Sequence, residues 1–181
     1  MLFRSLLVSA FLSGHPGFAV PPGKTVGGAL KSIPLCARAD QLGCVYVWSS
    51  YADDDASKPR FFGAQVPPGM VPACNSPSAP GGGRKPLKAF FRKPPGAPET
   101  DPPYVEALNQ LSGECVTDDL GSVLRIRIEP GPYAPLLQAG LARGATIPGW
   151  GLHILDMSLV QGDILDVVDA ETAAWSKAAR P

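Results

Sequence analysis

The sequence predicts an α/β fold in which strands alternate with long Pro/Gly-rich loops and a helix lies at the C-terminal end. Three observations support this prediction. Residues Cys44–Tyr51 are rich in β-branched and aromatic side chains, as strands are. Residues Val123–Ile128 alternate between apolar and polar, which is typical of a half-exposed strand. Between Ile154 and Val168, apolar residues recur at helical spacing.

The first twenty residues allow two interpretations. Arg4 precedes an apolar stretch and then small residues, which resembles a short signal peptide. His15 and Pro16 interrupt that run, and Leu6–Leu12 also has the character of a buried parallel strand. We favour the strand. No stretch reaches the ~18 apolar residues that a membrane span requires, so no transmembrane span is predicted.

The middle of the chain is predicted to be irregular. Residues 57–103 form a long loop or cap insertion, with breakers at Pro67–Gly69 and Gly81–Gly83. A loop of this length is commonly functional. We expect one domain over residues 1–170, with residues 171–181 as a tail.

Composition excludes some classes of function. The chain has 181 residues, with 16 basic and 16 acidic side chains and a formal net charge of zero. Because no basic stripe stands out, nucleic acid is not an expected partner. The 21 prolines and 20 glycines cluster between apolar runs without a period, which favours ordered loops around a modest core.

Four cysteines, Cys36, Cys44, Cys74 and Cys115, suit two disulfides. Cys36 and Cys44 bracket a short loop and are the natural first pair, which leaves Cys74 with Cys115. Four cysteines allow three pairings, and four free thiols in a cytosolic protein remain the alternative. Disulfides would favour a periplasmic or secreted location. Without C-x-x-C spacing and with only two histidines, neither a metal site nor a cofactor is predicted.

A candidate for catalysis is His153, in the tight loop Pro148–His153. The glycines at 149 and 151 allow a sharp turn there. A neutral imidazole in that position is a candidate general base for a serine hydroxyl. The alternative is a loop histidine bonded to nearby backbone.

A general base of this kind needs a carboxylate to orient it. Asp53 and Asp54 follow the strand Cys44–Tyr51 and are the candidate acids, although a solvated turn is the ordinary fate of such residues. Asp156, three residues after His153, is interpreted as a structural residue that caps the first helical turn or bonds nearby backbone.

The expected nucleophile motif, G-x-S-x-G on a strand-to-helix turn, does not occur in the sequence. Strand, loop, histidine and helix nevertheless follow one another as they do after the last strand of an α/β-hydrolase. The chain therefore indicates a partial α/β-hydrolase-like sheet.

Several segments together resemble a bacterial domain-of-unknown-function family of lysophospholipase-like α/β-hydrolases, in its C-terminal half. The most specific segment is Pro148–Asp156, followed by Gly162 and Asp163. The others are Leu7–Gly14, Val26–Ala29, Ile33–Cys36, Gln41–Val45, Trp48–Tyr51, Ala73–Pro77, Gly81–Gly83 and Glu114–Val116.

The resemblance implies a serine hydrolase whose nucleophile elbow lies before Leu7, in a region that this sequence does not contain. It gives His153 the place of the triad histidine and implies a small-molecule or lipid ester substrate. It carries over no acid. We therefore expect residues 1–170 to be the C-terminal portion of such a domain, inactive alone; the oligomeric state stays open.

The alternative is a non-enzymatic, disulfide-stapled secreted module for binding or structure. In such a module, four aromatic residues could line a ligand groove. The alternative is that these residues are ordinary core residues. These are Trp48, Tyr51, Phe61 and Phe62; for Trp48 we favour the core.

Overall fold

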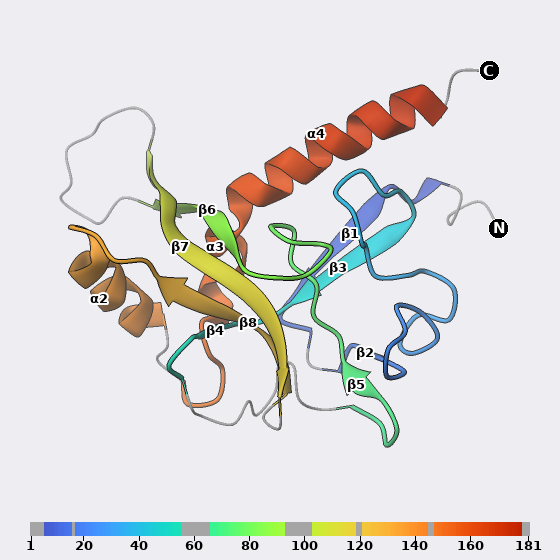
Figure 1. Ribbon diagram of the computed structural model, residues 1–181, viewed down its shortest axis with the longest axis horizontal. Helices are drawn as coiled ribbons and strands as arrows, with labels where there is room; N and C mark the ends of the chain where they lie inside the picture. Colours follow the sequence, from blue (N-terminus) through green and yellow to red (C-terminus); the bar gives the residue numbers. More distant parts are fainter. Residues whose placement is uncertain are drawn as a thin grey trace.

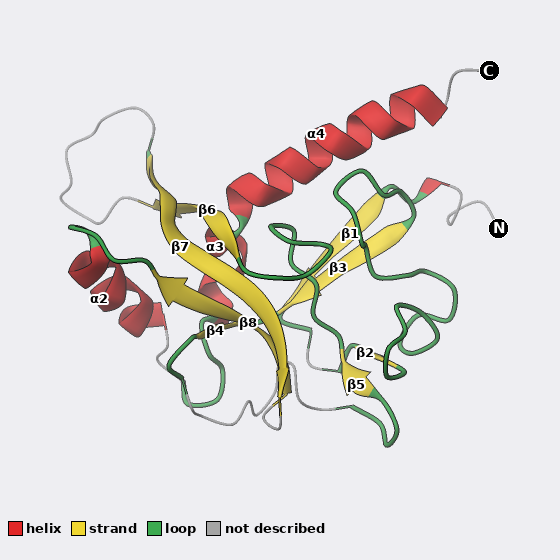
Figure 2. Cartoon of the chain, in the orientation of Figure 1, coloured by secondary structure: helices red, strands yellow, loops and turns green. Residues whose placement is uncertain are grey.

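A computed structural model describes residues 6–15, 17–55, 66–92, 103–118, 121–144 and 147–178, which form sheets flanked by helices (Figures 1 and 2). Among these residues, helices and strands both contribute substantially, so the predicted α/β class is confirmed. Phe61 and Phe62 lie outside the described residues.

Two pairs of parallel strands position the site. Strand β1 (Ser9–Ser13) pairs in parallel with β3 (Cys44–Trp48), and β4 (Ser50–Ala52) pairs in parallel with β8 (Gly121–Ile128). Only Ser49 separates β3 from β4, and its carbonyl accepts the N–H of Leu124 at 2.9 Å. The path β3–β4 therefore joins the two parallel pairs, and side chains of β3 are buried throughout, as is usual for parallel strands.

The sheet continues through two antiparallel strands, in the order β4–β8–β7–β6. These strands are β7 (Tyr104–Asp118), which crosses the front of the view in Figure 1, and β6 (Lys85–Arg92). A separate small pair joins β2 (Ala19–Val20) to β5 (Val71–Pro72).

The helices follow β8. Helix α2 (Ala134–Gly144) lies against β8, and the short helices η1 (His153–Leu155) and α3 (Asp156–Leu159) lead to α4 (Gln161–Ala178). The helices α3 and α4 pack on β6, and α4 extends toward β1 (Figure 1). There the Ser9 hydroxyl donates a 2.8 Å hydrogen bond to the buried Glu171 carboxylate.

The main core lies between the sheet and these helices. Trp48 and Tyr46 of β3 are fully buried in it, with Leu111 of β7, Leu124 of β8 and Leu159 of α3. The assignment of Trp48 to the core is thereby confirmed.

Both predicted disulfides form. Cys36 bonds to Cys44 and Cys74 to Cys115, so no cysteine of the chain is free. The first closes the loop before β3, and the second ties the segment after β5 to β7.

The structure corrects the predicted element boundaries. Part of the expected loop 57–103 is strand, because Leu87 and Ala89 turn alternate side chains of β6 into the core. The expected tail is also partly ordered: α4 runs to Ala178, since Glu171 still packs against β1. The predicted helix 154–168 is interrupted at Val160, where α3 ends and α4 begins.

Candidate functional site

The loop that carries His153 is fixed onto strand β4. The Leu152 N–H donates to the Ser50 carbonyl at 2.7 Å, and the Tyr51 hydroxyl donates to the Gly149 carbonyl at 2.9 Å. Gly151 has φ +60°, and a Cβ there would lie 2.5 Å from the Ser50 oxygen. Only glycine permits both this conformation and this close approach, so the loop presents His153 at one defined position.

The partner of His153 is Asp156. Nδ1 of His153 lies 2.8 Å from Oδ2 of Asp156, and the Asp156 side chain is 1% exposed. The other carboxylate oxygen, Oδ1, accepts the backbone N–H of Ser50 at 2.7 Å. Both carboxylate oxygens of Asp156 are thus hydrogen-bonded. Because this carboxylate is buried and held in place, its hydrogen bond to Nδ1 fixes the orientation of the imidazole ring.

This arrangement sets the protonation of the pair. The hydrogen bond to Asp156 raises the pKa of His153 above its ordinary value, and partial burial of the ring opposes that rise. Burial raises the pKa of Asp156, against the lowering effect of its bonds to His153 and Ser50. With Asp156 ionised, Nδ1 carries the proton of the neutral ring, and Nε2 is the basic nitrogen.

The imidazole also packs against the end of β1. A Cβ on Gly14 would lie 1.9 Å from Cε1 and 2.1 Å from Nδ1 of His153, so the ring contacts the bare backbone there. The Gly14 N–H donates to the Trp48 carbonyl at 2.8 Å, which links the ends of β1 and β3. His153 therefore lies at the carboxyl ends of parallel strands, where open α/β sheets place their ligands.

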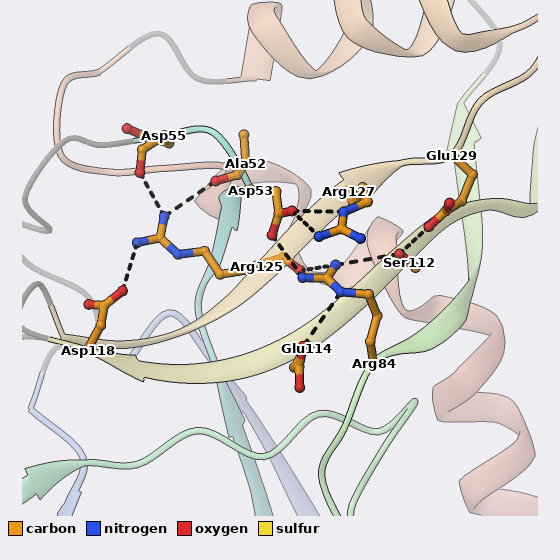
Figure 3. A network of polar contacts seen from close by, with 10 residues as sticks. All are labelled: Ala52, Asp53, Asp55, Arg84, Ser112, Glu114, Asp118, Arg125, Arg127 and Glu129. Atoms are coloured by element: carbon orange, nitrogen blue, oxygen red, sulfur yellow. Dashed lines mark hydrogen bonds and ion pairs between the residues drawn. The ribbon is translucent and has the colours of Figure 1, made fainter.

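The acids predicted from sequence occupy a different environment. Figure 3 shows Asp53 between two guanidinium groups, with its carboxylate 2.8 Å from Arg84 and 2.9 Å from Arg127. Burial raises the pKa of Asp53, but the bonds to Arg127 and Arg84 outweigh it and hold that pKa below its ordinary value. Asp54 is exposed on the same turn. The carboxylate that the structure brings to His153 is Asp156, which the sequence indicated only as a capping or structural residue.

The guanidinium groups near Asp53 belong to a wider network that fixes the end of β4 (Figure 3). Arg125 of β8 is almost fully buried and donates to the Asp55 carbonyl at 2.8 Å. It also pairs with Asp118 at the end of β7 at 3.4 Å. Each positive charge here faces carboxylate or carbonyl oxygens, so we interpret the network as structural.

The described residues contain no group of three histidine, cysteine, aspartate or glutamate side chains suited to hold a metal ion. None of their helices combines the length and the apolar character that crossing a membrane requires.

Comparisons with known proteins yield no relative. No protein-family model, no curated protein and no solved structure matches this chain.

Proposed function

We propose that this chain supplies the general base of a serine ester hydrolase of the α/β-hydrolase type. The observation that carries the proposal is the pair of His153 and buried Asp156, on a glycine loop at the carboxyl ends of parallel strands. The resemblance of Pro148–Asp156 to the lysophospholipase-like family supports the same assignment.

In the proposed reaction, Nε2 of His153 removes the proton of a serine hydroxyl while the serine oxygen attacks the ester carbonyl. Asp156 holds the ring and stabilises the imidazolium that forms. The imidazolium then returns its proton to the leaving alcohol, and water hydrolyses the acyl-enzyme by the same path. Because the sequence has no G-x-S-x-G motif, the proposal assigns the nucleophile to a polypeptide segment outside this sequence.

The test begins at the gene. We expect the reading frame upstream of Met1 to encode G-x-S-x-G in phase, and the extended protein to react with a fluorophosphonate probe at that serine. Within it, His153→Ala and Asp156→Asn are expected to slow labelling by about 10²- to 10⁴-fold, whereas Asp53→Asn is not. Stoichiometric labelling of the present chain, or an upstream frame without the motif, would refute the proposal.

The two disulfides favour a second candidate, a secreted binding or structural module that is not an enzyme. Both candidates place the chain in an oxidising compartment, periplasmic or extracellular. Intact mass measured without reductant on protein recovered from its native host is expected to be lower by two hydrogens per disulfide. An extended chain that carries the motif but resists the fluorophosphonate would favour this second candidate.

A further inference from the structure

A cavity of about 630 Å³ opens between helix α2 and the carboxyl ends of β4 and β8. Its volume falls within the range of ligand pockets, roughly 300–1,000 Å³. Ala52 ends β4 and Ile128 ends β8, so the cavity occupies the position at which open α/β sheets bind ligands. None of the proposed catalytic side chains lines it.

The inner wall of the cavity is apolar. Ile126 of β8, Leu141 of α2 and Leu152 are all buried side chains that line it. Alanines of α2, among them Ala134 and Ala142, leave room opposite them. None of the lining residues that the structure describes is aromatic, so their chemistry suits a saturated alkyl chain better than a stacked ring.

The polar residues of the cavity carry an excess of negative charge. Asp53, Asp54 and Glu129 contribute three carboxylates and Arg127 one guanidinium, a formal charge of minus two among the described lining residues. Arg84, outside the lining, also pairs with Asp53, so Asp54 and Glu129 are the carboxylates that matter most for a ligand. Arg127 is engaged by Asp53, and Glu129 accepts the Ser112 hydroxyl. A cation at the mouth of the cavity is therefore favoured over an anion.

The cavity is connected to the His153 loop through Leu152. This residue lines the apolar wall, precedes His153 in the chain, and its N–H donates to the Ser50 carbonyl at 2.7 Å. The backbone of Ser50 in turn holds Asp156. A ligand that occupies the cavity would therefore contact Leu152, whose backbone is bonded to the same residue, Ser50, that holds the partner of His153.

We propose that the cavity binds the alkyl chain of an amphiphile whose head group is cationic. That this amphiphile is part of the ester substrate rests on the proposed function; the binding itself does not. The alkyl chain lies against Ile126, Leu141 and Leu152, and the ammonium group faces Asp54 and Glu129.

The experiment uses three probes with one tail and different heads: decylammonium, decanol and decanoate. Their binding to the intact chain is measured by calorimetry and by amide shifts in NMR spectra. We expect decylammonium to bind at least about tenfold more tightly than decanoate, with decanol between them. The shifted amides are expected to include Leu152 and residues of α2.

Two variants locate the site. Ala142→Trp fills the cavity from α2 and is expected to weaken the binding of all three probes at least about tenfold. Ala139→Trp is the control, because Ala139 is an exposed residue of α2 outside the lining, and its binding of the probes should be unchanged. Asp54→Asn is expected to reduce the preference for decylammonium over decanoate at least about threefold, and Asp40→Asn, at an exposed position outside the lining, serves as its control.

Equal binding of the three heads, absence of binding at millimolar concentration, or insensitivity to Ala142→Trp would overturn the proposal. None of these outcomes involves a nucleophile, so they leave the proposed hydrolase function untouched. Conversely, an extended protein that resists fluorophosphonate refutes the hydrolase without affecting the binding result.

Discussion

Gly14 and His153 are in direct contact, and the contact leaves no room for a side chain at position 14. A Cβ on Gly14 would lie 1.9 Å from Cε1 of the imidazole, and the backbone there has φ +62°. Nδ1 of the imidazole is hydrogen-bonded to Asp156. Moving the ring away from a side chain at position 14 would therefore break that hydrogen bond.

The first prediction is that Gly14→Ala destabilises the chain by about 2–5 kcal/mol, from left-handed strain plus overpacking against the ring. Gly23→Ala is the matched control, because Gly23 has φ +69° but no atom within 4 Å of its Cβ position. That control is expected to cost only about 1–2 kcal/mol, as measured by urea unfolding.

A double-mutant cycle isolates the contact. When His153 is first replaced by alanine, Gly14→Ala should cost no more than Gly23→Ala does. An undiminished effect of Gly14→Ala in that background would show that the ring is not what excludes the side chain.

The second prediction concerns the acid that controls His153. Asp156→Asn removes the carboxylate that raises the pKa of His153, so that pKa is expected to fall. Asp53→Asn is expected to leave it unchanged, because the partners of Asp53 are Arg84 and Arg127. Imidazole Hε1 shifts followed by NMR against pH measure both, with His15→Gln used to assign the two histidines. A shift caused by Asp53→Asn alone would restore Asp53 as the acid.

The same linkage predicts how the pair stabilises the fold. The folded-state pKa of His153 is raised, so its contribution is fully present below pH ~6.5, the unfolded value, and is lost as pH rises through the folded-state pKa. The contribution of His153 to the free energy of unfolding is therefore larger at pH 5 than at pH 8. In Asp156→Asn, the difference in the free energy of unfolding between these two pH values should be smaller than in the original chain.

The sequence was informative about the strand positions and about His153, and it was less so about the carboxylate that contacts His153. His153 stood out because Gly149 and Gly151 mark a turn that only glycine makes, a local signal. The bond from Asp156 to the Ser50 N–H joins residues that are 106 positions apart, and no local pattern predicts it. The one available signal was the His-x-x-Asp spacing, which brings two side chains to one side of a helical turn.

Two elements escaped prediction for other physical reasons. Strand β7 is exposed on both faces over much of its first half, and Asn109 has φ +58°, so the alternation expected of a strand is weak there. Among the residues of helix α2 whose burial the structure describes, only Leu141 is buried, and Pro135 lies near the start of the helix. Proline is tolerated in the first turn of a helix, but in a sequence it usually indicates the end of a helix.

The third prediction concerns the start of α4, where Asp163 is buried against β6. Its Oδ2 accepts the Lys88 N–H at 3.0 Å, and burial raises the pKa of Asp163 to about 6. The folded state therefore holds this proton to a higher pH than the unfolded chain does. Stability is expected to fall as pH rises from about 4 to about 6, by up to about 3 kcal/mol.

Asp163→Asn keeps an oxygen acceptor for Lys88 but carries no charge. This variant should match the original chain near pH 4 and exceed its stability by about 1–3 kcal/mol at pH 8, in urea unfolding at both values. Asp169→Asn, at an exposed position of the same helix, controls for the change in net charge. A variant that is less stable than the original chain at pH 8 would mean that the charge of Asp163 is favourable where it lies.

The fourth prediction separates the two disulfides. Cys36 and Cys44 are 8 residues apart, whereas Cys74 and Cys115 are 41 apart. By the entropy of loop closure, the longer bridge should contribute about 4 kcal/mol and the shorter about 2.5 kcal/mol. Replacing Cys74 and Cys115 together by alanine should therefore destabilise the chain more than replacing Cys36 and Cys44.

The position of the longer bridge strengthens this expectation. It ties the segment after β5 to β7, and among the described strands β5 and β7 lie in different sheets. Cys36 and Cys44, by contrast, flank a backbone hydrogen bond that does not depend on the bridge: the Cys36 N–H donates to the Val45 carbonyl at 2.9 Å. Urea midpoints of both double variants, compared with the fully reduced chain, give the measurement. Equal losses of stability on removal of the two bridges would mean that burial of the Cys36 and Cys44 side chains outweighs the entropy of loop closure. In that case, single alanine variants of Cys36 and Cys44 should lose the same stability under reducing conditions, where no bridge is present.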